Sequence, residues 1–206
     1  MPSGICAIIL AAGASSRMGR DKALLPWPPD SKSATLLSAA ITALKPFAGA
    51  VLVVAGRNKI NLAPIAAACK AALVHNPSPE RGQFSSMQIG LRAALDAGYG
   101  NAMITPVDCP PLSFDSLARL RDAFEQARVR GAWAVAPENN GRRGHPLFAA
   151  RGLIEALLSA PVTGNAREVK RAHASRFEYV SVPDPLLAAD LNTPDEYAEA
   201  AARSAS

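Results

Sequence analysis

The residues best suited to chemistry lie in the first loop, where the apolar run 7–10 gives way to small residues and then to cations. The segment 10–22 reads Leu-Ala-Ala-Gly-Ala-Ser-Ser-Arg-Met-Gly-Arg-Asp-Lys. Small residues such as Gly13 let backbone N–H groups approach phosphate oxygens closely, and Arg17 and Lys22 can neutralise their charge. The segment therefore predicts a loop that binds the triphosphate of a nucleotide.

Two other phosphate-binding loops are excluded by the same residues. A Walker loop needs Lys and then Ser or Thr after its second glycine, but Gly19 is followed by Arg20 and Asp21. A dinucleotide-binding fingerprint needs a second glycine two residues after the first, but Gly13 is followed at that spacing by Ser15.

Two aspartates, Asp108 and Asp190, follow apolar segments and precede short stretches that contain proline. Mg²⁺ takes oxygen ligands, usually one or two protein carboxylates completed by phosphate oxygens and water. We predict that both aspartates hold Mg²⁺ beside the triphosphate, provided that the chain brings them to one edge of the sheet. A helix cap at Asp108 and a simple surface turn at Asp190 remain alternatives.

The segment 76–86 links a short expected strand to a helix and contains Gly82 and Ser86. Gly82 permits close backbone approach, and a helix start offers free N–H groups, so this loop suits the polar edge of a nucleobase. Ser85 is expected to open the helix as its N-cap, and Ser113 is expected to do the same for the helix over 114–128. A proline-stiffened turn without a ligand is the alternative.

A later turn, 140–146, is rich in glycine and cations and includes Arg143, Gly144, His145 and Pro146. These residue types suit a second substrate that carries a phosphate. A solvated β-turn without a binding role is the alternative.

Apolar runs expected to be strands alternate along the chain with helical runs. The expected strands are 5–10, 50–54, 72–74, 102–107, 132–135 and 177–182, and the expected helices are 35–44, 62–71, 85–97, 114–128, 151–159, 166–173 and 195–203. Nearly continuous apolar strands are typical of a mainly parallel sheet that is covered on both faces. The polar loops at the carboxyl ends of these strands are the expected ligand site.

The composition limits the classes of partner. A chain of 206 residues with 49% apolar residues is expected to be one domain, 1–206. The net charge of +5 is scattered and aromatic residues make up only 5%, which favours a small polyanionic substrate over nucleic acid. No apolar run is long enough for a membrane span, and the three widely spaced cysteines suggest reduced thiols, so we expect a cytoplasmic protein.

Taken together, these motifs resemble the molybdenum-cofactor cytidylyltransferases, a branch of the nucleotidyltransferases with the Rossmann-like nucleotide-diphospho-sugar transferase fold. The likeness spans almost the whole chain and implies a three-layer α/β/α architecture. Cys109 stands where the family often has Gln, and Asn192 where it often has Asp. The matching residues are Leu10 to Gly13, Ser15, Arg17 to Gly19, Lys22, Asn76, Gly82, Ser86, Met87, Gly90, Leu91, Asp108 to Pro110, Arg143 to Pro146 and Asp190 to Pro194.

The resemblance implies transfer of CMP from CTP to the terminal phosphate of a molybdopterin-type cofactor, with release of pyrophosphate. It implies that Arg17, Lys22 and Asp108 are catalytic and that Asp108 and Asp190 bind Mg²⁺. A molybdoenzyme that receives the product is implied as a partner. The implied nucleotide-binding residues are Leu10, Ala11, Ala12, Gly13, Ser15, Arg17, Lys22, Gly82, Ser86 and Asp108, and those for the second substrate are Arg143, Gly144, His145 and Pro146.

The choice of nucleotide is indicated by one residue of the first loop. The sequence Leu-Ala-Ala-Gly at 10–13 resembles the cytidylyl-transferring type, whereas guanylyl-transferring relatives usually carry Leu-Ala-Gly-Gly. Two alternatives stay open. One is an enzyme of the same fold that uses GTP or another nucleotide with a sugar or polyol phosphate, and the other is a non-catalytic chaperone that binds the cofactor.

Overall fold

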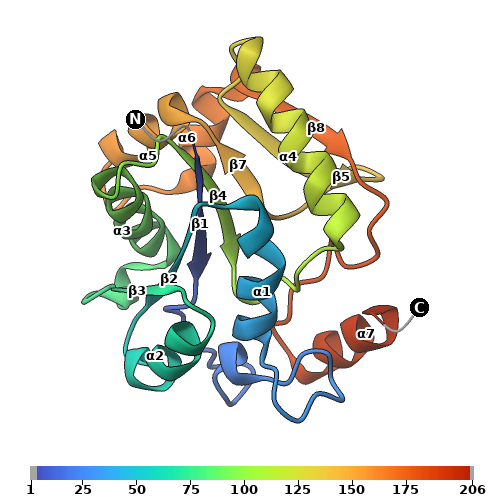
Figure 1. The fold of residues 1–206 in the computed structure, drawn as a ribbon. Helices are drawn as coiled ribbons and strands as arrows, with labels where there is room; N and C mark the ends of the chain where they lie inside the picture. Colours follow the sequence, from blue (N-terminus) through green and yellow to red (C-terminus); the bar gives the residue numbers. More distant parts are fainter. Residues whose placement is uncertain (1–3, 205–206) are drawn as a thin grey trace.

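The computed structural model describes residues 4–204, which form one eight-stranded sheet with helices on both faces (Figure 1). This confirms the predicted α/β fold with a mainly parallel sheet. The strands are β1 Ile5–Leu10, β2 Ala50–Ala55, β3 Ala72–His75, β4 Asn101–Pro106, β5 Ala134–Asn139, β6 Arg142–Arg143, β7 Leu147–Ala149 and β8 Phe177–Ser181. The α-helices are α1 Leu36–Leu44, α2 Lys59–Ala68, α3 Gln83–Asp96, α4 Phe114–Val129, α5 Arg151–Ser159, α6 Ala166–Ala172 and α7 Pro194–Ser204.

The strand order is β3-β2-β1-β4-β7-β5-β6, with β8 paired to β5 outside this path. Strands β1 to β4 pair in parallel, and so do β5 and β8. Strand β7 runs antiparallel to both β4 and β5, and β6 runs antiparallel to β5. Because β1 and β4 are parallel neighbours, the loops that follow them begin at the same edge of the sheet.

Residues of β1 alternate between two cores because successive side chains of a strand point to opposite faces. Ile5, Ala7 and Ile9 pack in a cluster with buried residues of α1, α2 and α4. Cys6 and Ile8 belong to a second cluster with α3 and α5. Every residue of β1 is buried, as the continuous apolar run predicts for a strand covered on both faces.

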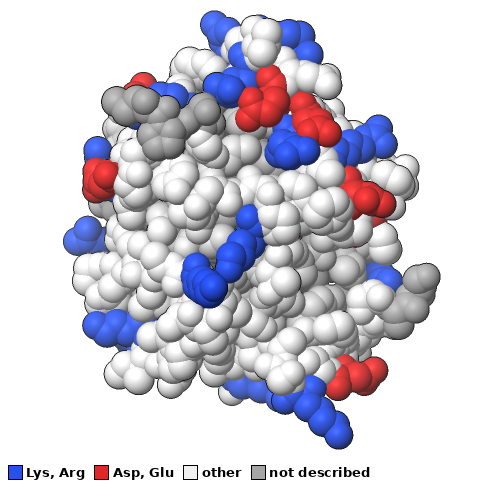
Figure 2. Space-filling model, viewed as in Figure 1, with Lys and Arg blue, Asp and Glu red and all other residues white. Residues whose placement is uncertain are grey.

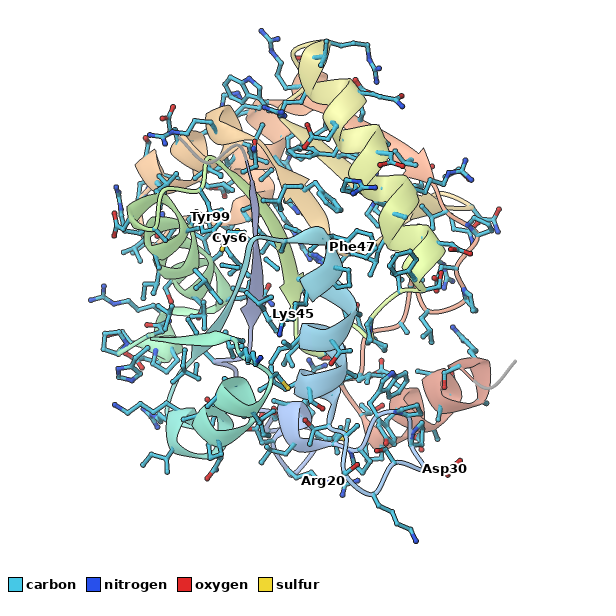
Figure 3. All side chains as sticks on the ribbon, in the orientation of Figure 1. Cys6, Arg20, Asp30, Lys45, Phe47 and Tyr99 are labelled. Atoms are coloured by element: carbon cyan, nitrogen blue, oxygen red, sulfur yellow. The ribbon has the colours of Figure 1, made fainter. Side chains whose placement is uncertain are left out.

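The long connection between β1 and α1 lies beyond the carboxyl end of the sheet. Figure 3 labels Cys6 on β1 and, beyond the end to which the arrowhead of β1 points, Arg20 and Asp30 in this connection. In Figure 1, α7 and α2 lie at the same end of the molecule. The connection and these two helices thus lie at the end of the molecule to which the carboxyl ends of the parallel strands point (Figure 1).

Three expected boundaries need correction, and two strands were missed. Helix α2 spans 59–68 rather than 62–71, because Lys70 adopts a left-handed φ of 56° after the helix end. Strand β5 begins at Ala134 rather than at 132, since Gly131 has a φ of 89° and the chain turns there. Strands β6 and β7 are two and three residues long, too short for a periodic signal.

Helix α3 also begins earlier than expected, at Gln83 rather than at Ser85. The preceding residue is Gly82, whose φ of 91° suits glycine and few other residues. Ser85 therefore lies in the first turn and is not the N-cap, whereas Ser113 caps α4 as predicted by accepting a hydrogen bond from Ser116.

Charge on the surface is dispersed in the view of Figure 2, where Lys and Arg side chains are separated by uncharged residues and several stand beside Asp or Glu. No continuous basic stripe crosses the face shown there. Within residues 4–204, none of the helices combines the length and hydropathy that a membrane span requires.

Gly90 lets α3 approach the sheet closely. A Cβ atom there would lie 2.6 Å from Ile8 Cγ2 and 2.9 Å from Val54 Cγ2, both in the buried core. Gly90→Val should therefore lower the free energy of unfolding by about 2–3 kcal/mol, because the helix must move outward. Urea denaturation measures this change.

Gly100→Val is the matched control for that substitution. A Cβ at Gly100 meets no atom within 4 Å, so a change within about 0.5 kcal/mol is expected. Equal stability of the two variants would show that the close packing of α3 at Gly90 does not matter.

Candidate active site

A cleft of about 200 Å³ lies at the carboxyl ends of β1 and β4. Three loops that the sequence analysis singled out meet there, the first after β1, the second before α3 and the third after β4. All residues predicted to bind a nucleotide line it except Arg17. The lining residues are Leu10, Ala11, Ala12, Gly13, Ser15, Asp21, Lys22, Pro79, Gly82, Gln83, Ser86, Val107 and Asp108.

Lys22 is a buried cation of this cleft, with only 8% of its surface exposed. Its Nζ donates a hydrogen bond to Asp108 Oδ2 at 2.9 Å and another to Asn192 Oδ1 at 2.8 Å. Its backbone N–H donates to the hydroxyl oxygen of Ser15 at 3.2 Å. The positive charge of Lys22 is therefore fixed in place by groups from three separate segments.

Arg17 lies outside the lining of the cleft but contacts the same asparagine. Its Nη2 donates to Asn192 Oδ1 at 3.2 Å, and the Arg17 side chain is otherwise exposed. A single exposed hydrogen bond constrains an arginine little, so Arg17 can turn toward an anion in the cleft.

The two predicted metal ligands, Asp108 and Asp190, both lie close to the thiol of Cys109. Cys109 Sγ donates to Asp190 Oδ1 at 3.2 Å. The backbone N–H of Leu191 donates to the backbone carbonyl of Asp108 at 2.8 Å, which joins the two segments. Burial raises the pKa of the Cys109 thiol well above its usual value, and the Asp190 and Asp108 carboxylates raise it further. The thiol therefore stays protonated and acts as a donor.

Two carboxylates gathered in this way suit a magnesium ion. Within the described residues 4–204, no three His, Cys, Asp or Glu side chains come together to form a metal site. An ion enclosed by protein ligands alone is thus a poor fit. Mg²⁺, which uses one or two carboxylates and takes its remaining oxygens from phosphate and water, fits Asp108 and Asp190.

The loop before α3 is held by a buried amide. Asn76, 1% exposed, donates through Nδ2 to the hydroxyl oxygens of Ser85 at 3.0 Å and Ser86 at 2.9 Å. Its Oδ1 accepts a hydrogen bond from the backbone N–H of Ser78 at 2.9 Å. The Ser85 hydroxyl in turn donates to the Gly82 carbonyl at 2.8 Å. Ser86 accepts from Asn76, so its own hydroxyl proton is left to donate into the cleft.

The turn predicted to bind a second substrate has its residues in two places, with His145 near the end of β4 and Arg143 packed elsewhere. His145 Nδ1 lies 3.4 Å from the Ile104 carbonyl, so the ring is next to the end of β4. Arg143 instead packs over Tyr179, with Cζ 3.8 Å from the ring centroid. Its Nε lies 3.7 Å from Glu138 Oε2. A role for this turn in binding a second substrate stays a prediction.

Close packing explains why residue 144 is a glycine. A Cβ there would collide with the backbone oxygen of Leu187 and lie 2.9 Å from Leu187 Cγ. The turn and the segment before Asp190 therefore cross at close range, which places His145 beside the aspartates.

The pKa of His145 is lowered by burial first and then by the positive charge of Lys170. The Ile104 carbonyl, Asp190 and Asp108 act in the opposite direction but do not outweigh these causes. His145 is therefore a neutral imidazole near pH 7.

Comparison with known proteins identifies the family. Residues 7–177, most of the chain, match the family described as the MobA-like NTP transferase domain. The chain belongs to this family. The resemblance expected from the motifs is thereby confirmed, and so is the nucleotidyltransferase class.

Relatives within the family carry two kinds of name. The chain is 27% identical to the molybdenum cofactor cytidylyltransferase of Escherichia coli K12 over 204 residues, 98% of this chain and 97% of that protein. It is 31% identical to the molybdenum cofactor guanylyltransferase of Cupriavidus necator over 198 residues, 93% of this chain and 94% of that protein. The names therefore leave the choice between CTP and GTP open.

Solved structures show the same fold. The crystal structure of Rv0371c from Mycobacterium tuberculosis H37Rv has a TM-score of 0.78 at 21% identity and covers 98% of this chain and 99% of its own. A second structure of that protein, with a TM-score of 0.71 at 20% identity, is a complex with manganese and covers 97% of this chain and 98% of its own.

Three site residues, Asn58, Asn76 and Asn192, escaped the sequence predictions because their roles depend on distant contacts. Asn192 was noted only as a departure from the family pattern, and Asn76 only as a matching residue. Asn58 donates through Nδ2 to the Ala11 carbonyl at 2.9 Å and to Asp21 Oδ2 at 2.7 Å, which ties the first loop to the start of α2. A polar residue just beyond a strand end was the available signal for Asn58 and Asn76.

Asn76→Ala should weaken both the fold and the nucleotide site. It removes two donors to buried hydroxyls and one acceptor from a backbone N–H, so a loss of about 1–3 kcal/mol in unfolding free energy is expected. We also expect the affinity for the nucleoside triphosphate to fall roughly tenfold. Urea denaturation and isothermal titration calorimetry measure the two effects.

Gln126→Ala serves as the control because it removes an exposed side-chain amide from α4, far along the chain from the site. It should change neither quantity measurably. If Asn76→Ala also leaves both unchanged, the buried amide does not organise this loop.

Proposed function

We propose that this chain transfers the CMP group of CTP to the terminal phosphate of a molybdenum cofactor and releases pyrophosphate. The observation that carries the proposal is the position of Lys22, whose ammonium is held between Asp108 and Asn192 on the wall of the cleft. A fixed cation and two nearby aspartates are what a phosphoryl-group transfer needs when its transition state gathers negative charge.

The preference for cytosine is supported by Ala12. Its methyl group lines the cleft, where guanylyl-transferring relatives usually have glycine. The methyl group narrows the space for a base, which favours a pyrimidine over the larger purine.

The proposed reaction does not need a strong general base to deprotonate the acceptor. A terminal phosphate has a second pKa near ~6, so its oxygen is already largely anionic at neutral pH. That oxygen forms the new bond to the α-phosphorus of CTP, the bond to the β-phosphate oxygen breaks, and pyrophosphate leaves with the electron pair. Lys22 neutralises part of the charge that develops on the leaving group, with Arg17 able to turn toward it.

Asp108 and Asp190 are the residues that would hold Mg²⁺. When bound, such an ion neutralises phosphate charge and fixes the orientation of the phosphates. The neutral His145 beside the aspartates adds no competing positive charge.

Asp108→Asn tests the metal assignment with little change of shape. It should lower the rate of pyrophosphate release from CTP and molybdopterin by about 10²–10³-fold, because one charged ligand and the partner of Lys22 are lost. Asp122→Asn, at an exposed aspartate paired with Arg121, should leave the rate unchanged. Normal activity of a folded Asp108→Asn protein would refute the assignment.

Ala12→Gly tests the choice of nucleotide. The wild-type chain should release pyrophosphate faster from CTP than from GTP, and Ala12→Gly should shift the ratio of kcat/KM toward GTP by roughly tenfold. Ala14→Gly makes the same change in the same loop but outside this cleft, and should leave the ratio unaltered.

The result with wild-type protein separates the three candidate functions. Preference for GTP, or for a sugar phosphate as acceptor, would replace this function by the alternative transferase. Tight binding of cofactor with no pyrophosphate release would favour the chaperone.

A further inference from the structure

A second cleft, of about 560 Å³, adjoins the first and shares Gly82 and Gln83 with it. Three arginines line it: Arg81 before α3, and Arg167 and Arg171 on α6. Its apolar wall is formed by Phe84 and Met87, whose exposed fractions are 7% and 5%. We refer to this space as the arginine cleft.

The cations of the arginine cleft are not neutralised by acidic side chains. Within residues 4–204, Arg81, Arg167 and Arg171 form no ion pair. The acidic residue that lines the cleft, Glu168, accepts instead a hydrogen bond from Asn165 Nδ2 at 2.7 Å.

Some exposed arginines elsewhere are paired with acidic side chains, whereas others, among them Arg92 and Arg119, form no ion pair within residues 4–204. Arg130 pairs with Glu178 at 2.6 Å, and Arg151 pairs with Glu155 at 2.6 Å. What distinguishes Arg81, Arg167 and Arg171 is therefore that they line one cleft beside the active site, where their charges act on the same space.

Helix α6 carries a third cation, Lys170, beside the two arginines that line the cleft. Arg167, Lys170 and Arg171 are three and four residues apart on α6, so they share one side of the helix. The pKa of Lys170 is lowered by burial, by Arg167 and by Arg143. Like charges crowded in this way repel one another, and a bound anion would relieve the repulsion.

Lys170 connects this group of cations to His145, since its charge lowers the pKa of that imidazole. His145 also experiences the charges of Asp190 and Asp108. Lys170 of α6 and both candidate metal ligands therefore lie near enough to His145 for their charges to act on it.

We propose that the arginine cleft binds a second anionic group of the acceptor, so that the acceptor carries a ring system and a negative charge in addition to the phosphate that reacts. This inference rests on the proposed function, because it assumes that an acceptor phosphate reaches Asp108. The arginines supply planar, permanently charged donors, and Phe84 and Met87 supply the apolar surface for the ring.

A binding experiment tests the cleft without relying on turnover. The probe is pyrene-1,3,6,8-tetrasulfonate, an aromatic polyanion, titrated by calorimetry in the presence of saturating CTP so that the nucleotide cleft is filled. The double substitution Arg167→Gln/Arg171→Gln should raise the dissociation constant at least tenfold and reduce its dependence on salt.

The matched control is Arg130→Gln/Arg151→Gln, which also removes two exposed arginines, from positions outside the cleft. It should change the dissociation constant less than twofold. The proposal is overturned if wild-type protein does not bind the probe, or if both double variants bind it equally well.

Steady-state kinetics then connect the cleft to the reaction. With molybdopterin as acceptor, the Arg167→Gln/Arg171→Gln variant should show a KM for the acceptor raised roughly tenfold, with the KM for CTP and kcat within twofold. An unchanged acceptor KM in that variant would overturn the inference. If wild-type protein releases no pyrophosphate with CTP and molybdopterin, the proposed function fails, whereas the binding experiment still decides whether the cleft takes an aromatic polyanion.

Discussion

The active-site arrangement depends on one buried ammonium group. Lys22 is 86 residues from Asp108 and 170 residues from Asn192 in sequence, yet Nζ contacts both within 3 Å. The Lys22 side chain is 10% exposed and that of Asp108 is 27% exposed, so solvent screens their attraction only in part. An unpaired charge would be costly at this depth. The pair therefore holds the first loop, the end of β4 and the C-terminal segment in one place.

The sheet and the C-terminal region make this meeting possible. Parallel pairing of β1 with β4 brings the first loop and Asp108 to the same edge. A small cluster that includes Trp27, Leu36 and Leu191 packs the C-terminal segment against the long connection. The Tyr197 hydroxyl on α7 donates to the Pro26 carbonyl at 2.7 Å, which ties the two regions further. The C-terminal helix thus contributes to the site by positioning the segment that carries Asp190 and Asn192.

The features that the sequence predicted well are those that depend on neighbouring residues. The apolar run of β1, the small-residue loop after it and the cap at Ser113 all carry local signals, and each was found at or near its expected place. The β7 strand, three residues long, carries no such signal, and its antiparallel place between β4 and β5 depends on the whole sheet. The role of Asn192 could not be predicted either, because its partners lie at the other end of the chain.

Charge changes sign along the surface that an acceptor would cross. At one end stand Asp108 and Asp190, which would be neutralised by a metal ion and are next to cations of the first loop. Close to both lies the Cys109 thiol, whose pKa is raised by its burial first and then by those carboxylates. His145 is nearby and its pKa is lowered, so both groups stay uncharged near neutral pH. At the other end, α6 presents cations without acidic partners. An acceptor with two separate anionic groups would therefore bind in one orientation, with one group at the metal ion and the other at the α6 cations. In the reversed orientation, an anionic group would lose its attraction to the α6 cations and gain no comparable attraction elsewhere. Burial keeps Cys109 and His145 uncharged, so the surface between the aspartates and α6 attracts neither anionic group of the acceptor.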